Sequence, residues 1–226
     1  MQALSNYQIA GIFDAAAESF DARSNPYTMR RRAEALAAKV YGRSLEAGGG
    51  TAAVTAALAD QSKAIHSDIA LGMCRIAREK VGCPSICLDA EQIPFADASI
   101  DTAVSAEMIC YLERPKCFIS EAHRVLKPRG RLVLSTTNPA MTFLERGRTF
   151  LRRLGFSRMF FDDGSPAFMA LDHLTAMLEQ TGFTIEEVRY IVVLPFACLD
   201  RLNRLLERTF LRRFGLFIVI VAKKNA

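Results

Sequence analysis

The stretch SLEAGGGTAAVTAAL, residues 44–58, decides the fold class of this chain. It begins as a short apolar run, passes through an acid at Glu46 and three glycines at Gly48, Gly49 and Gly50, and continues as small residues with helical character. A strand that turns tightly into a helix favours glycine here, because glycine tolerates unusual backbone angles and leaves room for a ligand at the helix amino terminus. The spacing G-x-G-x-x-A also fits the dinucleotide-binding pattern, so the turn alone does not separate a nicotinamide cofactor from an adenosyl cofactor.

The rest of the chain alternates short apolar runs with helical stretches from Arg43 onward, which is typical of strand-helix-strand units and a mostly parallel sheet. Helical patterning over residues 6–40 is broken at Asn25-Pro26 and predicts an N-terminal helical cap within residues 1–40. Residues 138–169 are rich in Phe, Arg and Met, and we expect them to form a lid or substrate segment beyond the strand ends. These patterns predict a single α/β domain over residues 1–226. The expected strands cover 43–47, 63–67, 85–88, 101–106, 130–136, 185–194 and 215–222, and the expected helices between and after them cover 51–59, 70–80, 115–126, 170–181 and 198–213.

The composition is that of an ordinary globular protein, with 50% hydrophobic and 23% charged residues in a chain of 226. The amino terminus lacks the basic start and apolar core of a secretory signal, and the apolar runs are far shorter than the ~20 residues of a membrane-spanning helix. We therefore expect a cytoplasmic chain without a membrane span. The six cysteines lack zinc-ligand spacing, which favours small buried side chains over a metal site.

The formal net charge is +5, and the arginines are clustered. Each cluster alternates with apolar residues at helical spacing, which favours amphipathic helices with a solvated basic face. The same pattern leaves open a contact with a membrane surface. The clusters are Arg30, Arg31 and Arg32; Arg146, Arg148, Arg152, Arg153 and Arg158; and Arg201, Arg204, Arg208, Arg212 and Arg213.

Three acids distinguish between possible cofactors. Glu46 stands two residues before the first glycine, where it would repel a dinucleotide pyrophosphate and attract an ammonium or sulfonium group. Asp68 follows Gly50 by 18 positions at the end of the next expected strand, where a carboxylate can accept hydrogen bonds from ribose hydroxyls. Asp89 ends the third expected strand and can accept a hydrogen bond from an exocyclic amine such as that of adenine.

Four segments together resemble the successive motifs of class I S-adenosylmethionine-dependent methyltransferases, of the small-molecule type that includes the ubiquinone-pathway enzymes. They are EAGGGTA at 46–52, Asp68, LDAEQIPFADASID at 88–101 and EAHRVLKPRGRLVLSTTNP at 121–139. The resemblance implies a Rossmann-like methyltransferase fold with helices on both faces of a seven-stranded, mostly parallel sheet whose last strand is antiparallel. It also implies S-adenosyl-L-methionine as the cofactor.

The resemblance assigns cofactor roles to ten residues. Those of the glycine turn match the motif that holds the methionine part. Asp68 matches the ribose-binding acid, and Ile69 matches the apolar residue beside the adenine. The others match the pair that recognises the adenine edge and the end of the fourth strand near the methionine amine and the reactive methyl. One departure is Ala52, which stands where the family commonly has a third glycine, and from which we expect weakened binding. The ten residues are Glu46, Ala47, Gly48, Gly50, Asp68, Ile69, Asp89, Ala90, Ser105 and Ala106.

The acceptor side is less defined by the sequence. Methyl transfer requires alignment of the nucleophile, and a catalytic base is optional. His66, His123 and His173 are the obvious candidates by pKa, and none is assigned a catalytic role. An aromatic-rich lining suggests an apolar or aromatic acceptor that is methylated on oxygen or carbon. The expected substrate-binding residues are Tyr7, Tyr27, Glu107, Phe143 and Phe160, with Phe13, Phe20, Met141, Phe161 and Phe168 as further lining residues.

Other functions stay open. Nucleic acid is not expected as a substrate. In this family, the methyltransferases that act on the amino groups of bases carry an Asn/Asp-Pro-Pro-aromatic signature after the fourth strand, where this chain has SAEM at 105–108. A nicotinamide-dependent oxidoreductase is disfavoured by Glu46 and by the lack of a Tyr-x-x-x-Lys pair. A lipid or quinone methyltransferase at a membrane surface, and a protein that binds the cofactor without transferring methyl, remain as alternatives. The sequence does not indicate an oligomeric state.

Overall fold

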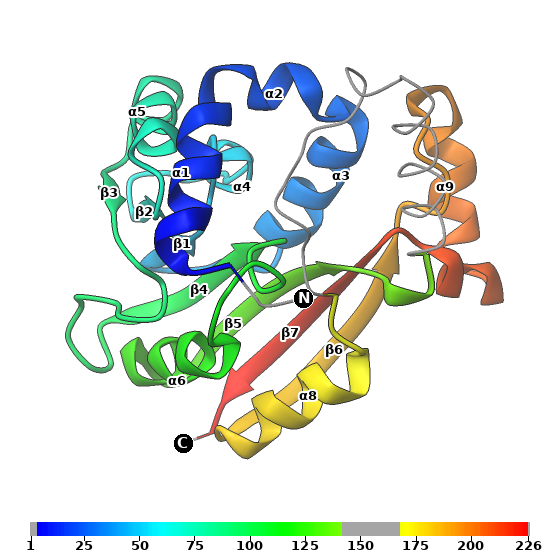
Figure 1. The fold of residues 1–226 in the computed structure, drawn as a ribbon. Helices are drawn as coiled ribbons and strands as arrows, with labels where there is room; N and C mark the ends of the chain where they lie inside the picture. Colours follow the sequence, from blue (N-terminus) through cyan, green and yellow to red (C-terminus); the bar gives the residue numbers. More distant parts are fainter. Residues whose placement is uncertain (1–3, 142–167, 226) are drawn as a thin grey trace.

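A central sheet of seven strands organises the fold in the computed structural model, which describes residues 4–141 and 168–225 (Figure 1). The strands lie in the order β3-β2-β1-β4-β5-β7-β6. β1 pairs in parallel with β2 and β4, whereas β7 pairs antiparallel with β5 and β6. The predicted Rossmann-like sheet with an antiparallel last strand is therefore confirmed. The strands are β1 (Ser44–Ala47), β2 (Ala64–Asp68), β3 (Ser85–Cys87), β4 (Ile100–Ala106), β5 (Leu126–Thr137), β6 (Phe183–Ile191) and β7 (Phe217–Lys224).

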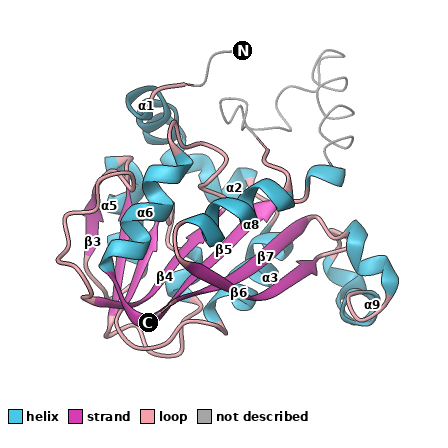
Figure 2. Cartoon of the chain, turned by 90° about the horizontal axis from the view of Figure 1, so that it is seen from below, coloured by secondary structure: helices cyan, strands magenta, loops and turns pink. Residues whose placement is uncertain are grey.

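Helices cover both faces of this sheet (Figure 2). Alternate residues of the central strands serve the two faces, because successive side chains of a strand point in opposite directions. Ala103 and Leu132 belong to the core beneath α6 and α8, whereas Val104 and Val133 belong to the core beneath α3. The helices are α1 (Asn6–Ala16), α2 (Phe20–Arg23), α3 (Pro26–Ala37), α4 (Ala53–Ala56), α5 (Leu71–Lys80), α6 (Pro115–Val125), α8 (Leu171–Gln180) and α9 (Asp200–Leu206), with short 3-10 segments η1 (Ala17–Ser19), η2 (Pro139–Met141), η5 (Ala197–Leu199) and η6 (Phe210–Phe214).

The break at Asn25-Pro26 is the start of α3. The Asn25 side chain accepts hydrogen bonds from the backbone N–H groups of Tyr27 and Thr28 at 3.0 and 3.1 Å, and Pro26 occupies the first helical turn. This is a favourable N-cap, because both residues satisfy or remove donors that the helix itself cannot use. α3 therefore begins where the sequence pattern predicts.

Two expected helices are shorter or interrupted. The helix expected over 51–59 is reduced to α4, because Ala52 adopts a left-handed conformation with φ of 63° just before it. The helix expected over 198–213 ends as α9 and is followed by η6, because Thr209 is extended and its hydroxyl accepts a hydrogen bond from the N–H of Leu211. Local hydroxyl bonds of this kind compete with helix propagation.

The arginine cluster at the start of the chain is not a uniform solvated face. Arg31 is buried, and its Nη2 donates to Glu207 Oε1 at 2.6 Å, which ties α3 to the end of α9. Arg30 is exposed and pairs with Glu34 one turn later. The expected basic face is therefore wrong for Arg31. Within the described residues, no helix has both the length and the apolar character needed to cross a bilayer.

Candidate functional site

A cavity of about 400 Å³ opens at the carboxyl ends of the parallel strands, beneath α1, α2 and α3. Its floor comes from the residues that follow β1, β2, β3 and β4, and its roof comes from the amino-terminal helices. Parallel strands end at one edge of a sheet, and ligands of open α/β sheets bind outside that edge. The cavity is therefore in the position that the fold offers to a cofactor.

The glycine turn between β1 and α4 has little space for side chains. Gly48 and Gly50 have φ of 62° and 54°, which disfavours other residues at both positions. A Cβ on Gly49 would approach His66 Nε2 to 2.6 Å and Glu46 Cδ to 2.8 Å. A Cβ on Gly50 would meet only Phe20 at 3.9 Å, so this glycine faces the open cavity. The turn thus rests on two buried side chains and presents bare backbone to a ligand.

Glu46 lies directly under this turn rather than in the cavity, with only 2% of its surface exposed. Its Oε2 accepts hydrogen bonds from the Thr55 N–H at 3.0 Å and from the Thr55 hydroxyl, whereas Oε1 has no hydrogen-bond partner among the described residues. Burial raises the pKa of this carboxyl to about 7, and the nearby charge of Asp68 acts in the same direction. A positive charge above the turn would stabilise the ionised form of Glu46.

His66 is the neighbour of Glu46 across β1 and β2. Ser85 donates its hydroxyl proton to the Cys74 carbonyl at 3.0 Å, so His66 Nδ1 must be the donor in its 2.8 Å bond with Ser85 Oγ. Nε2 is then an acceptor, and it has no partner among the residues that the structure describes. Burial lowers the pKa of His66 to about 4, which keeps the ring neutral. His66 supports the turn and does not line the cavity.

Asp68 and Asp89 stand on the cavity wall at neighbouring strand ends. Asp68 accepts hydrogen bonds from the N–H groups of Gly50 at 2.8 Å and Ala70 at 2.9 Å, and burial raises its pKa although these bonds oppose the shift. Asp89 accepts from the N–H of Glu91 at 2.8 Å and from Asn6 Nδ2 at 3.0 Å. Each carboxylate retains lone pairs for a ligand, because a carboxylate offers about four acceptor sites.

The sequence analysis missed Asn6. This residue belongs to α1, far from Asp89 in the chain, and lines the cavity beside it. No local pattern relates the two residues, because their contact depends on how α1 docks on the sheet.

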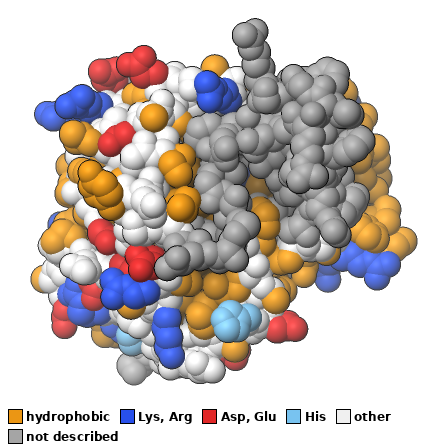
Figure 3. All heavy atoms as spheres, viewed as in Figure 1, with side chains coloured by type: hydrophobic (Ala, Val, Ile, Leu, Met, Phe, Trp, Pro, Cys, Tyr) orange, Lys and Arg blue, Asp and Glu red, His pale blue; other side chains and the backbone are white. Residues whose placement is uncertain are grey.

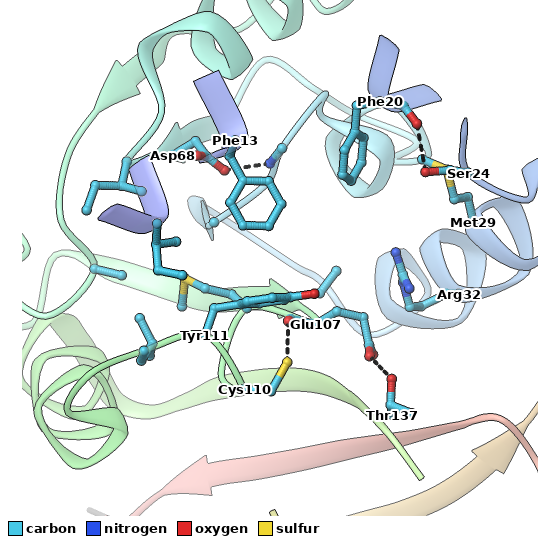
Figure 4. Close-up of a pocket in the computed structure, with 18 of the residues that line it drawn as sticks. Phe13, Phe20, Ser24, Met29, Arg32, Asp68, Glu107, Cys110, Tyr111 and Thr137 are labelled. Carbon is cyan, nitrogen blue, oxygen red and sulfur yellow. Dashed lines mark hydrogen bonds between the residues drawn. The ribbon is translucent and has the colours of Figure 1, made fainter. Parts of the chain in front are cut away.

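At the end of β4, three predicted residues take different positions. The Ser105 side chain is buried and does not line the cavity, whereas Ala106 and Glu107 do. Glu107 has φ of 61°, a strained conformation for a residue other than glycine. Its carboxylate accepts hydrogen bonds from Ser135 Oγ at 2.9 Å and Thr137 Oγ1 at 2.7 Å, which holds it at the cavity floor (Figure 4).

The part of the cavity beyond Glu107 is largely aromatic and apolar. Phe13 packs edge-to-face on Tyr111 with ring centroids 5.3 Å apart, and Phe20 lies 6.3 Å from Phe13. Figure 4 shows these rings around the cavity, with Phe20 on the same side as Met29 and Arg32 of α3. Phe168 also lines it.

The remaining sequence-predicted residues lie elsewhere. Ala47 is buried in the core next to the turn. Tyr7 is 88% exposed and does not line the cavity. Tyr27 is buried in the core, where its hydroxyl donates to Asp200 and accepts from Asn203. Phe143, Phe160 and Phe161 lie outside the described residues, as does the Met141 side chain.

Comparison with known proteins assigns a family to this geometry. Residues 45–134, which run from β1 into β5, match the family described as "Methyltransferase domain". The chain is 30% identical to an uncharacterized protein of Methanocaldococcus jannaschii, over 76% of this chain and 80% of that protein. The chain belongs to the class I S-adenosylmethionine-dependent methyltransferases. The enzymes of this family bind S-adenosylmethionine.

Two further similarities agree with this family. The chain is 29% identical to the ubiquinone/menaquinone biosynthesis C-methyltransferase UbiE of Paraburkholderia phytofirmans, over 56% of this chain and 59% of that protein. A solved methyltransferase of Thermotoga maritima, a possible histamine N-methyltransferase, has a TM-score of 0.68 and 22% identity over 95% of this chain and 99% of that one. The chain spans 22% and 26% of the lengths of the first curated relatives that it matches. The likeness therefore fixes the fold and the cofactor class but not the acceptor.

The site fits this methyltransferase cofactor on three counts. Gly50 leaves open space at the turn, Glu46 keeps an unpartnered buried oxygen beneath it, and Asp68 and Asp89 face the cavity from two adjacent strand ends. Glycine, carboxylate and apolar groups at these places suit a cationic sulfur nucleoside. In the described part of the chain, no group of three or more His, Cys, Asp and Glu side chains could hold a metal ion.

Proposed function

We propose that this methyltransferase transfers a methyl group to an oxygen or carbon atom of a small acceptor with an apolar or aromatic body. The observation that supports this proposal is the division of the cavity. One half is lined by the glycine turn, Asp68 and Asp89, and the other half by Tyr111, Met29 and Phe217, while Phe20 lies against Gly50 where the two halves meet. The first half suits the cofactor and the second suits an apolar acceptor.

The proposed cofactor contacts follow from the strand ends. Gly48 and Gly50 would lie against the methionine part, Asp68 would accept from the ribose hydroxyls, and Asp89 would accept from the adenine amine. Ile69, Ala90 and Ala106 would supply apolar contacts around these groups. Glu46 would act through the turn by its charge, and Ala47 and Ser105 would support the strand ends from behind. When bound, S-adenosylmethionine supplies a methyl group on a positively charged sulfur.

The acceptor half would act by orientation and by the exclusion of water. The cofactor would supply the methyl carbon to the nucleophilic atom of the acceptor and keep the carbon–sulfur electron pair on sulfur, and the acceptor proton would leave to the bulk solvent outside the closed cavity. Correct alignment alone lowers such a barrier substantially. All three histidines are among the described residues, and none lines the cavity, so we assign no catalytic base. Glu107 is proposed to contact the acceptor at the junction of the two halves.

We further propose a cap and a lid for one domain that spans residues 1–226. Residues from α1, α2 and α3 roof the cavity, which supports the cap role of residues 1–40. Phe168, near the end of the 138–169 segment, lines the cavity, which supports the lid role of that segment.

A two-stage experiment tests the proposed function. Calorimetry with S-adenosylhomocysteine measures whether the purified protein binds the demethylated cofactor, with NAD as the control ligand. Methyl-labelled S-adenosylmethionine is then incubated with a panel of phenols, enols, sugars and oligonucleotides. Label in phenols or enols supports the proposal, and label only in sugars or nucleic acid contradicts it. Binding without label in any acceptor, in the panel or in cell extract, would favour the non-methylating alternative.

A second candidate is a membrane-surface enzyme that methylates a lipid or quinone. The supporting observation is an exposed apolar surface on η5, α9 and η6, where Phe210 is 72% exposed and Leu205 is 59% exposed. Arg213 stacks on Phe210 and Phe214 with cation-to-ring distances of 5.8 and 5.1 Å. Figure 3 shows hydrophobic and basic side chains together at this side of the molecule. Apolar groups among arginines are suited to the headgroup region of an anionic bilayer.

Flotation with vesicles of phosphatidylglycerol and phosphatidylcholine tests this second candidate. Binding that increases with the anionic fraction and decreases in the variant Phe210→Ser supports it. The absence of flotation with any vesicle excludes it.

A further inference from the structure

Arg32 is a charged residue of the cavity wall that the proposed cofactor contacts leave unused. It lies on α3, is half-buried, and points into the acceptor half of the cavity (Figure 4). Its guanidinium lies over the ring of Phe217, 5.0 Å from the centroid, and Phe217 also lines the cavity. This cation–ring contact holds the guanidinium beside Phe217 and uses none of its N–H donors.

The neighbouring arginines of the same helix are paired, and Arg32 is not. Arg30 lies 2.9 Å from Glu34, and Arg31 lies 2.6 Å from Glu207. Among the described residues, no carboxylate lies within 4.0 Å of Arg32, and no hydrogen bond is formed by its guanidinium. A half-buried guanidinium without an anion is incompletely solvated, so an anionic ligand would be bound favourably at this place.

The acid of the same cavity region, Glu107, forms no ion pair with Arg32. Both oxygens of Glu107 accept hydrogen bonds from hydroxyls, those of Ser135 and Thr137, on the side of β5. The wall near Arg32 carries the apolar or aromatic side chains of Met29, Phe20 and Tyr111 beside the polar Ser24 and Thr137. The apolar part of this wall strengthens a charge pair beside it, because it excludes water that would screen the pair.

We infer that the acceptor carries a carboxylate, and that Arg32 binds this carboxylate while the apolar body of the acceptor lies against Phe20 and Tyr111. This inference rests on the proposed function and names the chemical class of its acceptor: a small aromatic or aliphatic acid. The planar guanidinium can donate two parallel hydrogen bonds to one carboxylate. The methylated atom is a different group of the acceptor, because a carboxylate in a two-fold ion pair with arginine is a weak nucleophile. Arg32 is thus a specificity-determining residue.

The experiment uses the full chain saturated with S-adenosylhomocysteine and two matched probes, 3-phenylpropionate and 3-phenylpropionamide. The probes share shape and apolar area and differ in charge. Calorimetry should give at least tenfold tighter binding of the acid to the wild-type protein. Arg32→Met keeps much of the apolar stem and should reduce this preference to less than threefold. Arg30→Met, two positions earlier on α3 and exposed, is the control and should retain the full preference.

The outcomes separate this inference from the proposed function. Equal binding of acid and amide to the wild-type protein overturns the carboxylate, as does a preference that persists in Arg32→Met. If Arg32→Met does not fold, the wild-type comparison still decides, and Arg32→Lys should show an intermediate preference because it keeps the charge without the planar fork. Failure to bind S-adenosylhomocysteine would instead contradict the proposed function.

Discussion

The buried acid under the glycine turn yields a prediction for the variant Glu46→Gln. The pKa of Glu46 is raised from 4.5 to about 7 in the folded protein. The folded state therefore holds a proton between these pH values that the unfolded state has already lost, and its stability falls as the pH rises through this window. At about 1.4 kcal/mol per pKa unit, the ionised Glu46 costs about 3 kcal/mol of folding stability above pH 7.

Glutamine removes this pH-dependent cost and keeps the shape of the side chain. Its amide oxygen can accept from Thr55, and its amide nitrogen can occupy the position of the unpartnered Oε1. We compare the free energy of unfolding of the ligand-free variant with that of the ligand-free wild type. The difference between the two, in favour of the variant, should be about 3 kcal/mol larger at pH 8 than at pH 4.5. For a chain of this size, that corresponds to a rise of roughly 6 to 12 °C in Tm.

The cofactor affinity should change in the opposite direction. The cationic cofactor favours an ionised Glu46, so its binding at pH 7 should release up to about half a proton from Glu46 in the wild-type protein and none from the glutamine of Glu46→Gln. We expect the variant to bind S-adenosylhomocysteine, which keeps the ammonium group, roughly tenfold more weakly, as for the loss of a charged interaction.

Thermal unfolding of the ligand-free proteins from pH 4.5 to 8.5 measures the first effect, and calorimetry in buffers of different ionisation enthalpy measures the second. The titration of His66 is present in both proteins and cancels in the difference. Glu34→Gln, on the exposed face of α3, is the control and should change stability by less than about 0.5 kcal/mol at every pH. A difference between Glu46→Gln and wild type that does not depend on pH would refute the reasoning.

Three other substitutions test the site at separate points. Gly49→Ala should destabilise the protein by about 1–3 kcal/mol in thermal unfolding, because its Cβ would approach His66 Nε2 to 2.6 Å. Gly82→Ala is the control and should cost much less, because a Cβ there meets nothing within 4 Å. Equal losses of stability in the two variants would contradict this prediction. Asp68→Asn should weaken S-adenosylhomocysteine binding roughly 10–100-fold in calorimetry, because it removes charge-assisted hydrogen bonds; unchanged affinity would remove Asp68 from the site. Tyr27→Phe should cost about 1–2 kcal/mol of stability, because it deletes the hydrogen bonds of a buried hydroxyl, and it should leave acceptor turnover unchanged. A loss of turnover without a loss of stability would instead indicate that Tyr27 contacts the acceptor.

The cofactor half of the cavity could be predicted from the sequence because its residues occupy fixed places relative to strand ends. Gly50, Asp68 and Asp89 each follow a parallel strand, and parallel strands end at one edge of the sheet. Knowledge of the strands and their order is then enough to bring the three residues together. Ala47 and Ser105 were predicted from the same motifs, but their side chains turn into the core, because alternate residues of a strand face opposite sides.

The acceptor half could be predicted only in its general character. Its aromatic lining at Phe13 and Phe20 agrees with the sequence analysis, but Tyr27, on the helix that carries Arg32, is directed into the core. The buried pair between Arg31 and Glu207, which are 176 positions apart, and the core packing of Leu36 hold one side of α3 away from the cavity. A helix-spacing pattern alone does not contain that contact, and a cluster of three arginines does not show which one is left unpaired.

Glu46 and His66 together explain how a buried site for a cation can be compatible with folding. Burial raises the pKa of the acid to about 7 and lowers that of the base to about 4, so between these two pH values the ligand-free protein keeps both groups largely neutral beneath the turn. A neutral interior avoids the full cost of a buried charge. The negative charge that attracts the cofactor then develops most fully when a cation is present above Gly49 to stabilise it. If this coupling holds, the loss of affinity in Glu46→Gln should be largest above pH 7 and should shrink toward pH 5, where the wild-type carboxyl must lose a proton before it can act.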